Sequence, residues 1–269
     1  MQRPSPATVR RLILVLVLAL WELVPRTGVI PELFLPALSK TLIVLVQGWD
    51  EYAHALLVTL YEVVLAMALA CGGGILVGAL VGGLASLRGL LLPVFSSLYA
   101  VPIVILYPIF TAWFGVGSQS KIAFAGIYGF FPVMLSTAAG IGTIDQNFLL
   151  AARSMGASVP QQIARVVIPA SIPTVLSGLR LGGALAIIGV VVSEMLTAAA
   201  GIGYLVTRYR TVLDSPRVFA GILMILVLSV AFDALARWVE RHTLAWQTAG
   251  RRERGVPTRA QPVGAPATA

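Results

Sequence analysis

Cysteine, histidine, lysine and acidic residues are all scarce in this sequence. Cys71 is the single cysteine in 269 residues, which excludes an intramolecular disulfide and any Cys-x-x-Cys motif. The two histidines, His54 and His242, are too few for a histidine-rich centre, so we expect no metal site. Only 11% of the residues are charged, against roughly 25% in soluble domains. So little charge excludes an ordinary soluble protein.

The two lysines do not belong to a nucleotide-binding loop. A Walker A loop has the pattern Gly-x4-Gly-Lys-Ser/Thr. Lys40 is followed by Thr41 but preceded by Ser39, and Lys121 is followed by Ile122. The chain therefore has no P-loop ATPase motif, and we expect it to be neither an enzyme nor the holder of a cofactor. ATP hydrolysis of this kind would have to come from another polypeptide.

Apolar residues are abundant and occur in long runs. They make up 58% of the chain, and the mean hydropathy is +0.91. A bilayer core of about 30 Å is crossed by about 20 apolar residues in a helix, and isolated strands cannot satisfy their backbone in lipid. We therefore predict an all-α integral membrane protein with about six transmembrane helices. They are expected at residues 12–24, 54–84, 90–114, 121–144, 174–200 and 218–238.

Basic residues indicate the orientation of this topology. They lie between the apolar runs rather than in one patch, so we expect no nucleic-acid binding. Thirteen of the nineteen fall on one side, and the positive-inside rule places that side and both termini in the cytoplasm. Residues 1–250 then form one transmembrane domain. Its external loop, residues 25–53, is predicted to contain a short surface helix. Residues 251–269 are predicted to be a disordered cytoplasmic tail.

The cytoplasmic loop at residues 145–173 is expected to hold two short helices. Asp145 is the predicted N-cap of a helix that runs to Met155, and Gly156 ends it in a left-handed conformation. Ser158 and Gln161 then have the spacing of a capping box that starts a second helix.

The second helix of this loop has an apolar stripe that includes Ile163 and Val166. We expect Pro169 and Pro173 to break the chain before the next span. Two short helices joined by a glycine are suited to insert into a groove of a partner protein. The alternative from the pattern alone is an amphipathic pair that lies on the lipid surface.

Part of this loop resembles a known motif. Residues Ala151 to Gly156, nine further residues and Val166-Val167-Ile168-Pro169 are similar to the EAA loop of bacterial ABC-importer permeases. That motif reads Glu-Ala-Ala-x-x-x-Gly, nine residues, Ile-x-Leu-Pro, and here Leu150 replaces its glutamate. The resemblance implies docking on a cytoplasmic ATPase through Ala151, Ala152, Arg153, Gly156, Ser158, Gln161, Ile163, Val166 and Pro169.

Shorter motifs along the chain resemble the nitrate, sulfonate and taurine permease subgroup. They are Trp21-Glu22-Leu23, Thr59-Leu60, Trp113 to Gly117 with Lys121, Phe130-Phe131-Pro132, Gly178-Leu179-Arg180, Ser193-Glu194-Met195 and Gly201-Ile202-Gly203-Tyr204. The subgroup has an arginine where Glu62 stands here.

This resemblance implies a multi-pass permease of the bacterial cytoplasmic (inner) membrane, forming a homodimer among membrane lipids. Its expected partners are an ATP-binding subunit, which uses ATP and Mg²⁺, and a periplasmic or lipid-anchored solute-binding protein. The implied substrate is a small anion such as a sulfonate, taurine or nitrate. A thiamine-pyrimidine precursor and riboflavin are the alternatives.

Few polar side chains lie inside the predicted spans. Glu194 is the acid of the fifth span, and a carboxylate near the bilayer centre costs roughly 2.5–3.5 kcal/mol. It is expected either at the translocation path or dimer seam, with Tyr107 and Ser136, or as a hydrogen-bonded structural acid. Glu62 is expected at the outer membrane interface.

Two other functional classes are alternatives to a permease subunit. An intramembrane serine protease would need Gly-x-Ser-Gly and a membrane histidine, and Ser177-Gly178 lacks the first glycine. An ion-driven secondary transporter remains the alternative class, although coupling ions usually need several buried acids and Glu194 is the clear candidate.

Overall fold

The computed structural model describes residues 5–197 and 199–244, and this part of the chain is helical. The predicted tail, residues 251–269, lies outside the described residues. The helices are α1 (Pro6–Arg26), α2 (Leu38–Gln47), α3 (Trp49–Gly83), α4 (Ala85–Tyr99), η1 (Ile103–Leu106), α5 (Tyr107–Phe114), α6 (Ser118–Gly142), α7 (Gln146–Ser154), α8 (Val159–Gln162), η2 (Ile163–Val167), α9 (Ile168–Thr197), α10 (Ile202–Thr211) and α11 (Ser215–Thr243).

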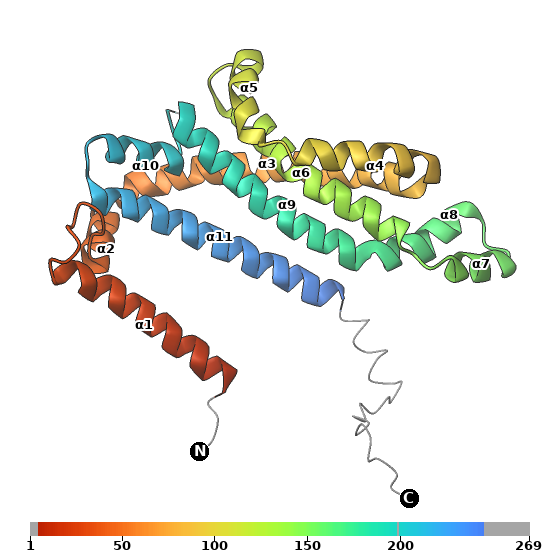
Figure 1. Cartoon of the computed structure of the whole chain (residues 1–269), viewed down its shortest axis with the longest axis horizontal. Helices are drawn as coiled ribbons and strands as arrows, with labels where there is room; N and C mark the ends of the chain where they lie inside the picture. The colour runs from red at the N-terminus through yellow and green to blue at the C-terminus, as the bar shows by residue number, and fades with distance from the viewer. Residues whose placement is uncertain (1–4, 198, 245–269) are drawn as a thin grey trace, which may run out of the picture.

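Helices α3, α6 and α9 pack side by side as the centre of the molecule, with α11 along α9 (Figure 1). Glycines bring the backbones together. A Cβ atom on Gly78 of α3 would lie 2.6 Å from the Met134 carbonyl oxygen of α6. One on Gly129 of α6 would lie 2.6 Å from the Gly182 carbonyl oxygen of α9. Small residues thus provide the close contact on which helix packing in lipid depends.

The structure changes the predicted number of spans. Four helices of the described part are long and apolar enough to cross a membrane: α3, α6, residues 159–197 and α11. The predicted third span, residues 90–114, is broken, because α4 and the following η1–α5 segment meet at 81°. Pro102, which cannot donate a helical hydrogen bond, lies at this break. Counting the bent pair as one span gives five.

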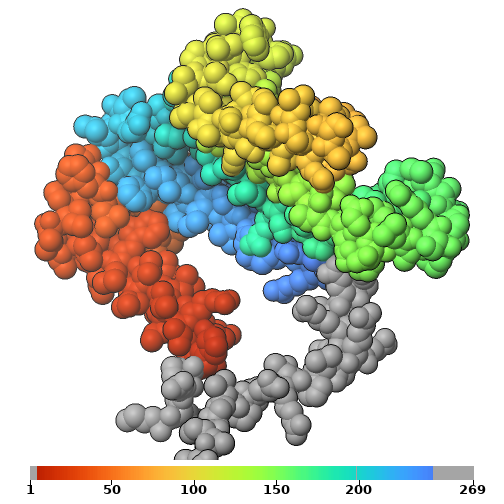
Figure 2. All heavy atoms as spheres, turned by 45° about the vertical axis from the view of Figure 1, so that its right-hand side comes forward, coloured from red at the N-terminus to blue at the C-terminus, as the bar shows by residue number. Residues whose placement is uncertain are grey.

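The predicted first span forms α1, but its apolar stretch is short. The ten residues from Leu12 to Trp21 lie between charged residues and extend about 15 Å, half of a bilayer core. Figure 2 shows α1, in red, standing away from the bundle. The C-terminal end of α1 is attached to the start of α2. Trp21 Nε1 donates to the Pro36 carbonyl at 3.1 Å, and Ser39 N donates to Glu22 Oε2 at 2.9 Å.

The two ends of the bundle have different elements. The short helix predicted within residues 25–53 is α2, and it lies with α10 at one end (Figure 1). Helices α7 and α8 form the opposite end. The loop that resembles a docking motif is therefore separated from α2 and α10 by the length of the bundle.

Candidate functional site

The first half of the loop has the local structure that its sequence predicts. Asp145 caps α7, with its Oδ1 accepting from Asn147 N at 2.9 Å. Gly156 follows the helix with φ +77°, a conformation in which residues with side chains are strained. In the capping box of α8, Ser158 N donates to Gln161 Oε1 at 2.9 Å. These features fix the turn between α7 and α8.

The second half of the loop differs from the prediction. Pro169 and Pro173 do not break the chain, because one helical segment continues from Val159 to Thr197. The wide π turn of η2 ends at Val167, two residues before Pro169. In an α-helix the proline ring would press against the Arg165 carbonyl, and the wider turn relieves that contact. The loop is thus continuous with α9, and the span begins earlier than residue 174.

A single buried glutamine joins the two halves of the loop. The Gln162 side chain is 8% exposed. Its Nε2 donates to the Ala157 carbonyl at 2.9 Å, and its Oε1 accepts from Arg153 Nε at 3.3 Å. The Gln162 side chain therefore holds the two halves of the loop together. The motif residues of the loop differ in their exposure. Ala152 is buried, Val166 and Pro169 are half-buried, and Ala151, Arg153, Gly156, Ser158, Gln161 and Ile163 are exposed.

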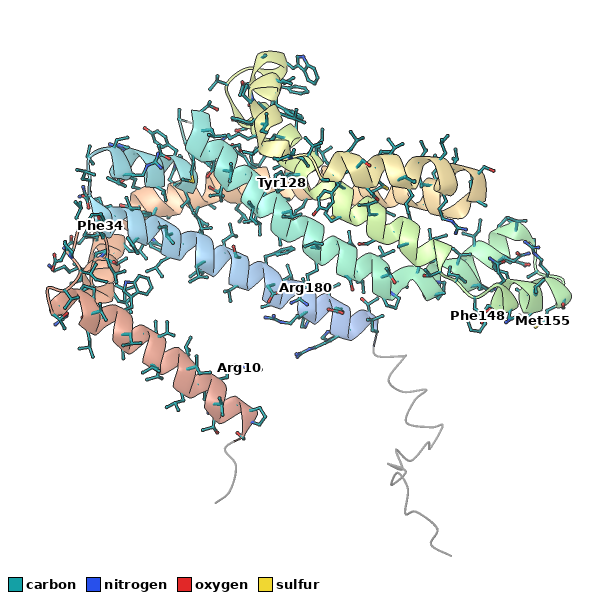
Figure 3. All side chains as sticks on the ribbon, in the orientation of Figure 1. Arg10, Phe34, Tyr128, Phe148, Met155 and Arg180 are labelled. Atoms are coloured by element: carbon teal, nitrogen blue, oxygen red, sulfur yellow. The ribbon has the colours of Figure 1, made fainter. Side chains whose placement is uncertain are left out.

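Large apolar side chains project from this loop. Phe148, Leu150 and Met155 are 61%, 56% and 81% exposed, and Figure 3 shows Phe148 and Met155 at the tip of the molecule. The position of the family's glutamate, Leu150, is thus part of an apolar surface. Such a group of exposed side chains is typical of an interaction site.

A second group of polar residues is buried among α3, α9 and α10. The Glu194 carboxylate accepts from Thr59 Oγ1 at 2.7 Å and from Gly203 N at 2.8 Å. Thr59 Oγ1 in turn accepts from Ile202 N at 2.9 Å. Two free N–H groups in the first turn of α10 are satisfied in this way. Glu194 and Thr59 are 1% and 0% exposed, so the structure supports the hydrogen-bonded structural role.

One turn further along α3, Glu62 forms an ion pair inside the protein. Its Oε1 lies 2.5 Å from Lys121 Nζ of α6, and the two side chains are 0% and 4% exposed. Glu62 is therefore enclosed by protein, and its position at the outer membrane interface stays a prediction. A charged group so deeply buried needs a partner of opposite charge, and Lys121 provides it. Spacing alone could not pair residues 59 positions apart.

The other predicted path residues are also enclosed by packing. Tyr107 is 2% exposed, and its hydroxyl is 2.7 Å from Thr197 Oγ1. Ser136 is half-buried and packs against Gly178, where a Cβ atom would lie 2.8 Å from its Oγ. Glu194 and Tyr107 are thus buried within the protomer, and their place at a translocation path or dimer seam stays a prediction.

Comparison with known proteins identifies the chain's family. Residues 74–244 match the family of binding-protein-dependent transport system inner membrane components. The chain belongs to this family. It is the permease subunit of an ABC importer and a multi-pass protein of the inner membrane.

Relatives of this permease are named for different transported solutes. It is 31% identical over 234 residues to SsuC of Bacillus subtilis, described as an aliphatic sulfonates transport permease, covering 86% of this chain and 84% of that one. It is 28% identical to ThiX of Halalkalibacterium halodurans, a formylaminopyrimidine transport permease, covering 92% and 99%. A structure of the MetNI methionine ABC transporter, described as inward facing, has the same fold, with a TM-score of 0.57, 15% identity and coverage of 72% and 94%.

Proposed function

We propose that this permease docks a separate ATP-binding subunit on the α7–α8 loop and receives a small solute from an external binding protein. The α7–α8 end then faces the cytoplasm, and the α2–α10 end faces outward. The exposed Phe148, Leu150 and Met155 support this docking surface. The partner binds and hydrolyses ATP with Mg²⁺, since this chain lacks a Walker A loop. Two copies of the permease enclose the translocation path.

The observation that carries the proposed mechanism is the continuous segment from Val159 to Thr197. ATP-driven closure of the partner subunits moves the α7–α8 loop. Because α8 continues through η2 into α9, that movement turns α9 against α6, where glycine contacts are close. The path then opens alternately to the two sides. No ion coupling is required.

For the substrate, we propose a small anion such as an aliphatic sulfonate, taurine or nitrate, which the similarity to SsuC supports. A second candidate is a thiamine-pyrimidine precursor or riboflavin, and the similarity to ThiX supports the first of these.

The experiment is to express the permease with the ATPase and binding-protein subunits encoded beside it and to purify through a tag on the permease. Gly156→Pro disrupts the left-handed glycine turn between α7 and α8. Gly28→Pro is the matched control, because φ is +75° at Gly28 and +77° at Gly156, and both N–H groups bond to a carbonyl three residues back. Neither position has a neighbour within 4 Å of an added Cβ atom.

We expect the parent and Gly28→Pro to retain the ATPase, whose activity in lipid rises with loaded binding protein. Gly156→Pro should lose both. Ligand screening on the binding protein then distinguishes a sulfonate from a pyrimidine. If the parent permease purifies with no ATPase, the proposed docking on the α7–α8 loop fails.

A further inference from the structure

A large cavity lies behind α7, α8 and η2, which together are called the docking loop below. It is on the side away from the apolar tip of this loop. Its volume is about 880 Å³. The walls come from the end of α3, the start of α4, the end of α6, the loop and the start of α9. They are mainly aliphatic, and include Ile75, Ala79, Ile141, Leu149, Ile163 and Val175.

Arg88 is the charged residue among those that line this cavity. It is half-buried, and its Nη1 donates to the Gly142 carbonyl at the end of α6 at 3.2 Å. No carboxylate in residues 5–197 or 199–244 forms an ion pair with it. The hydroxyls of Thr137 and Ser171 already donate to carbonyls of their own helices. Gln162 Nε2 also donates to a carbonyl, so the unused donors of the cavity are the remaining N–H groups of Arg88, which carry charge, and the exposed amide of Gln146.

We propose that this cavity binds an anionic phospholipid of the cytoplasmic leaflet, with an acyl chain along the aliphatic walls and the phosphate on Arg88. The inference rests on the proposed orientation. The walls belong largely to membrane-spanning helices, so lipid is the apolar molecule at hand. A guanidinium without a carboxylate partner is complementary to a phosphate, and anionic lipids give the cytoplasmic leaflet its negative surface potential.

The position of the cavity gives the lipid a role in coupling. Leu149 and Ile163 belong to the docking loop, whereas Ile75 and Ile141 belong to α3 and α6. An acyl chain between them contacts the loop on one side and these two spans on the other. The bound lipid therefore supports the loop as it transmits force to α9.

The test is native mass spectrometry of the full-length permease, purified with its partner ATPase when one associates, in detergent with equal phosphatidylglycerol and phosphatidylcholine. Arg88→Gln removes the charge but retains a donor for the Gly142 carbonyl. Arg241→Gln is the control, because Arg241 is exposed on α11 and does not line the cavity. Ala79→Trp is a second variant that fills the cavity and leaves Arg88 in place.

We expect Arg88→Gln to bind phosphatidylglycerol about tenfold more weakly, or about 1.4 kcal/mol, and to leave phosphatidylcholine unchanged. Ala79→Trp should reduce both lipids, and Arg241→Gln neither. Equal phosphatidylglycerol binding by Arg88→Gln and the parent, or an equal loss in Arg241→Gln, would overturn the proposal. Lipid binding to the permease is measured without nucleotide and does not require the ATPase. A failure to bind lipid is therefore distinct from a failure to bind the ATPase.

Discussion

The Glu194 carboxylate closes the first turn of α10, with Oε2 2.8 Å from the backbone N of Gly203. Its other oxygen accepts from Thr59 of α3. One side chain of α9 thereby joins α3 to the reversal of the chain between α9 and α10. Gly201, at this reversal, has φ +105° and no space for a Cβ atom beside the carboxylate.

We predict that Glu194→Ala destabilises the permease by about 2–4 kcal/mol, because it leaves the buried N–H of Gly203 without an acceptor and removes buried side-chain volume, while the Thr59 hydroxyl keeps the Ala55 carbonyl. Gly201→Ala should have a similar effect, since the new methyl group displaces the carboxylate. Gly28→Ala is the control: its φ is +75° with open space, and it should cost about 1–2 kcal/mol. Thermal unfolding in detergent measures all three. Equal midpoints for Gly201→Ala and Gly28→Ala would contradict this role of Glu194.

The ion pair between Glu62 and Lys121 allows a double-mutant cycle. Removal of one partner leaves an unpaired buried charge, so Glu62→Gln and Lys121→Met should each cost about 3–5 kcal/mol. The double variant should cost clearly less than the sum of the two, because it leaves no charge unpaired. The free energy of unfolding in detergent is the measurement. Strictly additive effects would show that the two side chains do not interact.

Local sequence patterns predicted the turn between α7 and α8 well and the long-range contacts poorly. The N-cap of Asp145, the left-handed Gly156 and the capping box each depend on residues within a few positions. The pairs Glu62–Lys121 and Thr59–Glu194 join different helices. Periodicity gives each helix a face but does not say which helix packs against it.

Prolines account for two further differences between sequence and structure. Pro169 and Pro173 predicted a break, yet the helix continues, with the π turn of η2 beside Pro169 and with Pro173 inside α9. Residues 90–114 predicted one span, yet the chain bends by 81° near Pro102. Hydropathy measures apolar length, and it contains no information on whether a proline is accommodated or bends the chain.

Transmission of movement from the loop through the continuous helix can be tested by substitutions that lower the local stability of that helix. Ala164→Gly in η2, with Ala170→Gly in the first turn of α9, removes two exposed methyl groups, and each glycine costs about 1 kcal/mol of helix stability. We expect the ATPase to remain bound, while its stimulation by loaded binding protein falls severalfold. Ala234→Gly, exposed on α11, is the control. Unchanged stimulation in the double variant would contradict transmission through this helix.

The most direct measurement of the central claim is site-specific crosslinking at the tip of the docking loop. Cys71→Ser gives a cysteine-free background. Met155→Cys then places one thiol on the loop, and Phe34→Cys places one at the opposite end (Figure 3). Met155 and Phe34 are 81% and 69% exposed. With a photoactivated thiol reagent in membranes that contain the candidate subunits, Met155→Cys should crosslink to the ATPase and Phe34→Cys should not. An ATPase crosslink from Phe34→Cys, or none from Met155→Cys, would contradict the account.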